Sequence, residues 1–247
     1  MHRLRSTALL TLLLVSPLLS VPGKSIAGNK HSVAERLEFA LNAKTPSALK
    51  ALLGVQGSKV VLSRMRLLTS RFPEVSWSVR SRQQLYNGLL VVDIGVRGQQ
   101  SKSGFNFTLE AQQRLALRVE EDRIAVQEII SEQSILHSSL DPLLVTLLIP
   151  DTVLMGSRYD VDIIFDEPLG NAMVAGGLIE VTPGQVLKQQ SPDIPLEPLS
   201  SGGLFKSVQA PLQPGVQFWA ALLVHPQGVL AVTKRVRIVT SQDQVAS

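Results

Sequence analysis

The sequence predicts an α+β N-terminal domain, with helices on a curved antiparallel sheet, followed by an all-β sandwich. Residues 33–70 place apolar side chains at helical spacing, residues 75–130 change to period-two alternation, and only strand and turn patterns follow Asp141. The predicted boundaries are a signal peptide at 1–27, the α+β domain at 28–138, the sandwich at 139–240 and a disordered tail at 241–247.

The first residues have the three-part layout of a secretory signal peptide. Arg3 and Arg5 give a basic start, Thr7 to Leu19 form an apolar run, and Ser25-Ile26-Ala27 is a small-x-small cleavage triplet. The apolar run is shorter than the ~20 residues that a membrane-spanning helix needs. We therefore expect an exported protein without a stable membrane span in its mature form. Its compartment would be the periplasm, the extracellular space or, in a photosynthetic bacterium, the thylakoid lumen.

Charge and cysteine content exclude several functional classes. Without residues 1–27 the formal net charge falls from +4 to +1, and nucleic-acid binding requires a denser cationic surface. The absence of cysteine excludes disulfides, thiolate metal sites and a cysteine nucleophile. Residues 28–138 carry a net charge of +5 and residues 139–247 a net charge of −4. This asymmetry either docks the halves or orients a partner, or reflects two differently charged solvated surfaces.

Capping signals predict three helices in the first half. Ser32 and Glu35 have the spacing of a capping box. Thr45-Pro46 starts a second helix, which Gly54 ends. The third helix is expected from Ser58 to Ser70, with one apolar stripe.

Strand patterns continue to the C-terminus, and no helix is expected in the second half. The residues from Gly98 to Gly104 and from Gln189 to Gly203 read as loops, and Gly176-Gly177 as a turn. The predicted strands are 75–80, 89–96, 105–119, 124–130, 143–149, 159–166, 173–181, 204–209, 216–224 and 229–239. The last two are expected to form a hairpin through His225 to Gly228.

This order of elements resembles two known folds. Residues 32–137 resemble the nuclear transport factor 2-like superfamily, the cone-shaped fold shared with ketosteroid isomerase. Residues 141–240 are similar to immunoglobulin-like sandwiches that lack the cysteine pair; the landmarks are Leu-Ile-Pro-Asp at 148–151, Gly-Ser-Arg-Tyr at 156–159 and the terminal hairpin. With its leader, the chain looks like a family of exported cyanobacterial proteins. Such a resemblance implies architecture and transfers little chemistry.

Polar residues on apolar strand faces are the candidates for a pocket in the first domain. Asp93, Gln113 and Glu128 each interrupt an apolar series. A carboxylate in that setting would have a raised pKa and act as a general base. Ketosteroid-isomerase-type chemistry also needs an oxyanion donor, and Tyr86 sits beside a turn, so the set is incomplete. The ordinary alternative to a catalytic role is that these carboxylates are exposed at a sheet edge or are buried in a pair with an arginine.

Charged residues suggest two further sites. Asp160, Asp162 and Asp166 would offer oxygen ligands to calcium, although no glycine-bearing loop folds them around an ion and a solvated strand face explains them equally. The candidates for holding an anion are four arginines on different predicted elements: Arg64, Arg66, Arg80 and Arg82.

No zinc, nucleophile or phosphate-loop motif is present. His31, His137 and His225 are far apart in sequence and read as surface residues, and neither G-x-S-x-G nor a glycine-rich phosphate loop occurs. No cofactor is expected. The leading hypothesis is an exported, non-enzymatic protein that binds a small apolar ligand or a protein in its first domain and uses the sandwich as a second interaction surface. The alternative is a small isomerase or hydrolase with Asp93 or Glu128 as base, and a third possibility is a structural role in an envelope complex.

Overall fold

The computed structural model describes residues 32–43, 45–86, 89–102, 104–120, 123–138, 143–187, 191–199 and 201–242. The predicted signal peptide at 1–27, His31, the turn residues Asn87-Gly88 and the end of the predicted tail lie outside the described residues.

The helices are α1 Val33–Asn42, α2 Pro46–Arg71 and α3 Pro183–Leu187. The sequence marks the start of α1, the start of α2 and the break within α2, but not α3. The capping box is confirmed, because Ser32 N donates to Glu35 Oε2 at 2.8 Å and Glu35 N donates to Ser32 Oγ at 3.2 Å. The break at Gly54 is also confirmed, since its φ of 69° interrupts α2 with a conformation that only glycine adopts easily. The short helix α3 contradicts the prediction of a second half without helix.

Twelve strands are assigned within the described residues. Those of the first half are β1 Glu74–Tyr86, β2 Leu89–Lys102, β3 Phe105–Glu120 and β4 Arg123–His137. Those of the second half are β5 Val145–Leu148, β6 Thr152–Leu154, β7 Arg158–Phe165, β8 Ala175–Val181, β9 Glu197–Pro198, β10 Gly203–Gln209, β11 Gly215–His225 and β12 Gly228–Val239.

The predicted fold class is wrong. The described chain is mostly strand, and its large antiparallel sheet has the hydrogen-bonded order β1-β2-β3-β4-β12-β11-β8-β9, with β6 pairing β12. It is not a helix-covered cone followed by a separate sandwich. The cause lies in β4, which continues beyond Ile130 and pairs through Glu132–His137 with Arg235–Leu230 of β12. The predicted strand 124–130 and the predicted domain boundary after residue 138 thus lie where the sheet continues.

The expected loop at 98–104 and the expected turn at Gly176-Gly177 are both wrong. In each place a glycine of the strand is in close contact with another segment. β2 extends through the expected loop to Lys102, and a Cβ on Gly98 would meet Phe72 Cβ at 2.9 Å. Gly176 and Gly177 lie inside β8, which confirms the predicted strand 173–181 and contradicts their assignment as turn glycines; a Cβ on Gly177 would lie 2.0 Å from the carbonyl oxygen of Pro195. In both places a missing side chain allows another segment to approach the strand.

The chain divides into two compact units, each described by itself. The helix-bearing unit comprises the described residues up to Gln100 together with Glu110–Ile130. The strand unit comprises Ser101–Leu109 and the described residues from Ser131 onward.

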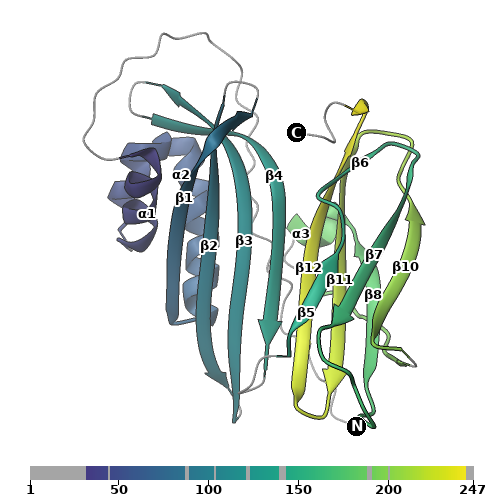
Figure 1. Ribbon diagram of the computed structural model, residues 1–247. Coiled ribbons are helices and arrows are strands. Elements are labelled where there is room, and N and C mark those ends of the chain that lie inside the picture. Colours follow the sequence, from purple (N-terminus) through teal and green to yellow (C-terminus); the bar gives the residue numbers. More distant parts are fainter. Residues whose placement is uncertain are drawn as a thin grey trace. The chain divides into compact units, whose positions relative to one another are not determined.

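The strand unit consists of two layers around one apolar core. One layer contains β12, β11 and β8, and the other is a three-stranded sheet with the order β10-β7-β5 (Figure 1). Side chains from both layers, such as Val161, Ile163, Leu223 and Val232, are at most 1% exposed and belong to one core cluster. Alternation along β7 produces this arrangement, since its odd-numbered residues are buried and its even-numbered residues are not.

In the helix-bearing unit, α1 lies beside the edge strand β1 (Figure 1). Glu38 Oε2 accepts a hydrogen bond from Val79 N at 2.7 Å, and the Asn42 side chain bonds to the backbone of Trp77. Helix side chains therefore satisfy backbone groups that an edge strand would otherwise leave open.

Candidate binding sites

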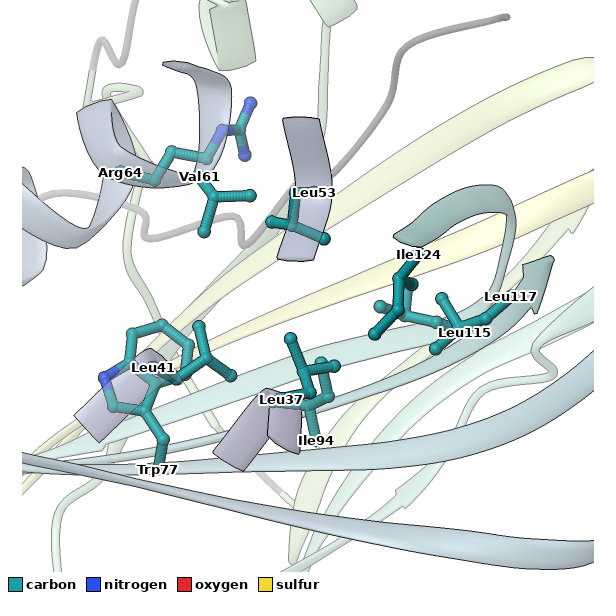
Figure 2. Close-up of a pocket in the computed structure, with 10 residues that line it drawn as sticks. All are labelled: Leu37, Leu41, Leu53, Val61, Arg64, Trp77, Ile94, Leu115, Leu117 and Ile124. Atoms are coloured by element: carbon teal, nitrogen blue, oxygen red, sulfur yellow. The ribbon is translucent and has the colours of Figure 1, made fainter. Parts of the chain in front are cut away.

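The helix-bearing unit contains a small apolar pocket between its helices and its strands. Five lining residues come from α1 and α2 and five from β1 to β4 (Figure 2): Leu37, Leu41, Leu53, Val61, Arg64, Trp77, Ile94, Leu115, Leu117 and Ile124. Nine of these side chains are apolar, and Arg64 is the polar residue among those drawn (Figure 2). The pocket therefore suits an apolar group.

The free space inside this pocket is small. Its volume of about 20 Å³ is room for one water-sized group. A larger occupant requires its walls to move. Gly54, with its φ of 69°, lies in α2 between the lining residues Leu53 and Val61 and divides the helical wall into two parts.

Asp93 does not line this pocket. It neighbours Ile94 on β2, and successive strand residues face opposite sides of a sheet, so Asp93 lies on the face away from the pocket. There its carboxylate binds two arginines, accepting from Arg82 Nε at 2.6 Å and from Arg114 Nε at 2.7 Å. Pairing with arginine was the expected alternative to a catalytic role for this carboxylate.

The other two pocket candidates differ in burial. Gln113 is 1% exposed and lies on β3 with the parity of Leu115 and Leu117, but it is not among the lining residues. Glu128 is half-buried on β4 and does not line the pocket. The structure thus brings none of the three polar candidates to the pocket wall.

The four candidate anion-binding arginines do not share one site. Arg64 is half-buried at the pocket, and Arg66, on the same helix, is exposed. Arg80 and Arg82 are exposed on β1, where Arg80 is in register with Asp93 and Arg82 forms an ion pair with it. Asp93 thus neutralises part of the positive charge on that face of the sheet.

The candidate calcium ligands Asp160 and Asp162 lie on the outward face of β7, Asp166 follows the strand directly, and two of the three have other partners. Asp162 Oδ1 accepts from Lys206 N at 3.3 Å, Asp166 Oδ1 accepts from Thr146 Oγ1 at 2.7 Å, and Asp160 is exposed. At about 3.3 Å per residue, Asp160 and Asp166 are about 20 Å apart along the chain, so the three carboxylates do not share one ion. Within the described part of the chain, no group of three or more histidines or carboxylates could hold a metal ion.

The expectation that the histidines are surface residues fails for His137. It ends β4 and is 8% exposed, whereas His225 is half-buried and its Nδ1 accepts from Gln227 N at 3.2 Å. His137 is buried because β4 continues beside β12, where it lies in register with Leu230.

A polar network in the core of the strand unit was not predicted from the sequence. Trp219 Nε1 donates to Tyr159 Oη at 2.9 Å, and Tyr159 Oη donates to Gln217 Oε1 at 2.8 Å. Burial raises the pKa of Tyr159, the negative charge of Glu180 raises it further, and the hydrogen bond from Trp219 opposes both.

Buried charges on β12 were missed as well. Arg235 is 7% exposed and lies in register with Glu132, which is 3% exposed. Lys234, 6% exposed, pairs with Asp151 and donates to Gln133 Oε1 at 3.3 Å. The sequence signals this site by the run Lys234-Arg235-Val236-Arg237 inside an otherwise apolar strand. A cation on a buried strand requires a partner, so this run could have indicated buried ion pairs.

Comparisons with known proteins describe the second half only. Residues 140–239 match a protein-family model described as Domain of unknown function (DUF8623). A search of the curated proteins found no match to the chain. That description contains no activity or ligand, so the resemblances to nuclear transport factor 2-like and immunoglobulin-like proteins stay predictions. None of the described helices is both long enough and apolar enough to cross a membrane.

Proposed function

We propose that the chain is an exported, non-catalytic binding protein. The pocket of the helix-bearing unit receives an apolar group of a small ligand or of a protein partner, and the strand unit provides a second interaction surface. One observation carries this proposal: the pocket is lined by nine apolar side chains and Arg64, while Asp93 is bound by two arginines on the opposite face. No observation favours the isomerase or hydrolase alternative.

An occupant enters by displacement of the helical wall. The free volume of about 20 Å³ admits only a methyl-sized group in the present arrangement. Separation of the two parts of α2 at Gly54 enlarges the pocket without unfolding the strands beneath it. An apolar occupant is favoured because each buried methylene group contributes about 0.8 kcal/mol.

The test uses the apolar fluorophore N-phenylnaphthylamine, whose emission rises in apolar surroundings. Leu115, 0% exposed at the pocket, is replaced by alanine to enlarge it and by tryptophan to fill it. We expect Leu115→Ala to bind the probe several-fold more tightly and Leu115→Trp to lose binding. Leu223→Ala is the matched control, since Leu223 is equally buried but lies in the strand unit. Equal responses of both alanine variants would show that the probe reports loosened packing instead of this pocket.

Export is tested separately, on protein from the native cell envelope. Mass spectrometry of the N-terminal peptide should find a chain that starts at Gly28, after the triplet Ser25-Ile26-Ala27. An intact leader on envelope protein would contradict the proposed export.

A further inference from the structure

Three arginines surround one carboxylate on the face of the sheet that lies away from the pocket. Asp93 of β2 accepts from Arg82 Nε of β1 at 2.6 Å and from Arg114 Nε of β3 at 2.7 Å. Arg80 of β1 is in register with Asp93, and residues directly opposite each other share a face of the sheet. These four residues, which we call the arginine cluster, all belong to the helix-bearing unit.

Most hydrogen-bond donors of these arginines are unused. A guanidinium has five N–H donors, and Arg82 and Arg114 each give only the Nε–H to Asp93. Within the described part of the chain, no hydrogen bond is formed by their terminal nitrogens or by the guanidinium of Arg80. The side chains of Arg82 and Arg114 are 49% and 31% exposed, and Arg80 is exposed as well. The unused donors are therefore open to a ligand from solvent.

Asp93 orients two of the arginines without cancelling the charge of the cluster. Three guanidiniums and one carboxylate leave a net charge of +2. Because the two oxygens of Asp93 hold the Nε ends of Arg82 and Arg114, these guanidiniums stay close together despite their mutual repulsion. Val91 and Ala116, each two positions from a member of the cluster, are 4% and 0% exposed and pack together, which fixes the strands beneath. The positive charge is thus preorganised before a ligand binds.

The other acidic side chains of β1 to β3 lie far from this cluster. Glu110 pairs with Arg97 at 3.1 Å and Glu120 pairs with Arg118 at 3.6 Å. Both glutamates are on β3, four and six residues from the arginine of the cluster on that strand, or roughly 13 and 20 Å at 3.3 Å per residue. Glu74 begins β1, six residues before the first arginine of the cluster. Among the described residues of β1 to β3, Asp93 is therefore the one carboxylate beside the three arginines.

A glycine leaves room for a ligand beside the arginines. Gly95 follows Asp93 by two residues on β2, so it shares the same face, and it is in register with Ser78 of β1. Ser78 Oγ lies over this glycine, because a Cβ on Gly95 would be 2.7 Å from it. The ion pairs between β2 and β3 place the exposed Gln112 on the other side of Gly95. The floor beside the cluster thus carries no side chain and is flanked by a hydroxyl and an amide, both of which can donate.

We propose that Arg80, Arg82 and Arg114 bind a phosphate group, with the hydroxyl of Ser78 as a further donor. A phosphate monoester carries a charge of about −1.5 to −2 at neutral pH and three acceptor oxygens, which fit the charge and the number of donors of the arginine cluster. Arginine also binds phosphate through two parallel N–H···O bonds. A carboxylate ligand has a single charge and two oxygens, and it would leave many of these donors unused. The inference goes beyond the proposed function, because the phosphate site and the apolar pocket lie on opposite faces of the sheet.

Isothermal titration calorimetry with methyl phosphate at low ionic strength tests the site. We expect saturable binding with one site per chain, which weakens as salt is added because the site is exposed. The double variant Arg80→Gln/Arg82→Gln should lose about tenfold or more in affinity, since it removes charge-assisted hydrogen bonds. Arg80→Gln alone should bind several-fold more weakly. It keeps the test valid if the double variant is unstable, because no hydrogen bond or ion pair links Arg80 to a described residue.

The matched control removes the same charge from the same face outside the cluster. Arg97→Gln/Arg118→Gln deletes two arginines that are each paired with a glutamate, and it should change the affinity by less than about twofold. Equal losses in the two double variants would show that methyl phosphate follows the overall charge of the sheet, and they would overturn the inference. Binding of acetate as tightly as methyl phosphate would overturn it too.

Two further probes distinguish the sources of the phosphate group. Inorganic phosphate represents a free anion, and vesicles of phosphatidylcholine with or without phosphatidic acid represent a lipid headgroup. Binding of either probe that is lost in Arg80→Gln/Arg82→Gln supports the site and identifies the source, whereas an unmodified chain that binds none of the three phosphate probes overturns the inference. N-phenylnaphthylamine titration reports on the pocket independently. A chain that binds this fluorophore but no phosphate therefore loses the phosphate site and leaves the proposed function standing.

Discussion

Asn42 binds the backbone of Trp77 through both ends of its side-chain amide. Asn42 Nδ2 donates to Trp77 O at 2.8 Å, and Trp77 N donates to Asn42 Oδ1 at 3.1 Å. The amide thereby takes the place of a neighbouring strand at the outer edge of β1. One helix residue attaches α1 to the strand whose Trp77 side chain lines the pocket.

Replacement of Asn42 by alanine should destabilise the chain by about 1–3 kcal/mol, because it leaves a backbone donor and acceptor of β1 unsatisfied. Urea unfolding followed by circular dichroism measures the change. Lys50→Ala, at an exposed position of α2, should change the free energy of unfolding by less than about 0.5 kcal/mol. Equal effects of both substitutions would contradict a specific role for Asn42.

The buried Tyr159 predicts a loss of stability in alkaline solution. Its pKa is raised in the folded state, so below the unfolded pKa of about 10 its contribution to stability is fully present. As the pH rises above 10, the unfolded chain releases this proton while the folded chain retains it, and stability falls until the folded pKa is passed.

Urea titrations at increasing alkaline pH compare the unmodified chain with Tyr159→Phe. Each retained proton changes the slope by up to about 1.4 kcal/mol per pH unit, so the variant should lose stability less steeply. It should also be less stable at neutral pH, since Trp219 and Gln217 lose their shared partner. Identical alkaline slopes would show that Tyr159 titrates normally.

The pair of Lys234 and Asp151 predicts strong coupling between two substitutions. Asp151→Ala leaves the ammonium of Lys234, which is 6% exposed, without its carboxylate partner, at an expected cost of about 3–5 kcal/mol. The double variant Lys234→Met/Asp151→Ala should recover much of this loss, because methionine places no charge in the core. A double-mutant cycle of unfolding free energies measures the coupling, and additive effects would contradict it.

Gly177 should not tolerate a side chain. A Cβ there would lie 2.0 Å from Pro195 O and 2.7 Å from Ile194 Cγ2, so we expect Gly177→Ala to cost at least about 1–3 kcal/mol. Gly184→Ala in α3 is the control, because nothing lies within 4 Å of its Cβ and alanine is the better helix former. Thermal unfolding should show a lower midpoint for the first variant and an equal or higher midpoint for the second.

Local features were predictable because their determinants are close in sequence. The capping box at Ser32 and Glu35 and the break at Gly54 depend on residues within one helical turn. The hairpin of β11 and β12 depends on two alternating segments and the turn between them, and its register closes on His225 and Gly228 as expected.

The candidate site was less predictable. Isolated polar residues within apolar strands are visible in a sequence, but whether Asp93 faces a pocket or two arginines depends on strands β1 and β3. The pocket itself combines residues from six elements, and no motif connects them.

The amino-acid order by itself determined where most helices and strands begin and end, since capping, turns and periodicity act over a few residues. Only the tertiary structure decided that β4 continues as one strand beyond Ile130. Its polar run from Ser131 to Ser134 lies beyond the predicted strand 124–130, and there Ser134 Oγ lies 2.6 Å from Thr233 Oγ1, an atom of a residue 99 positions away. Sheet pairing joins segments that are distant in sequence, and the partner that makes a polar segment a strand is therefore not encoded within that segment.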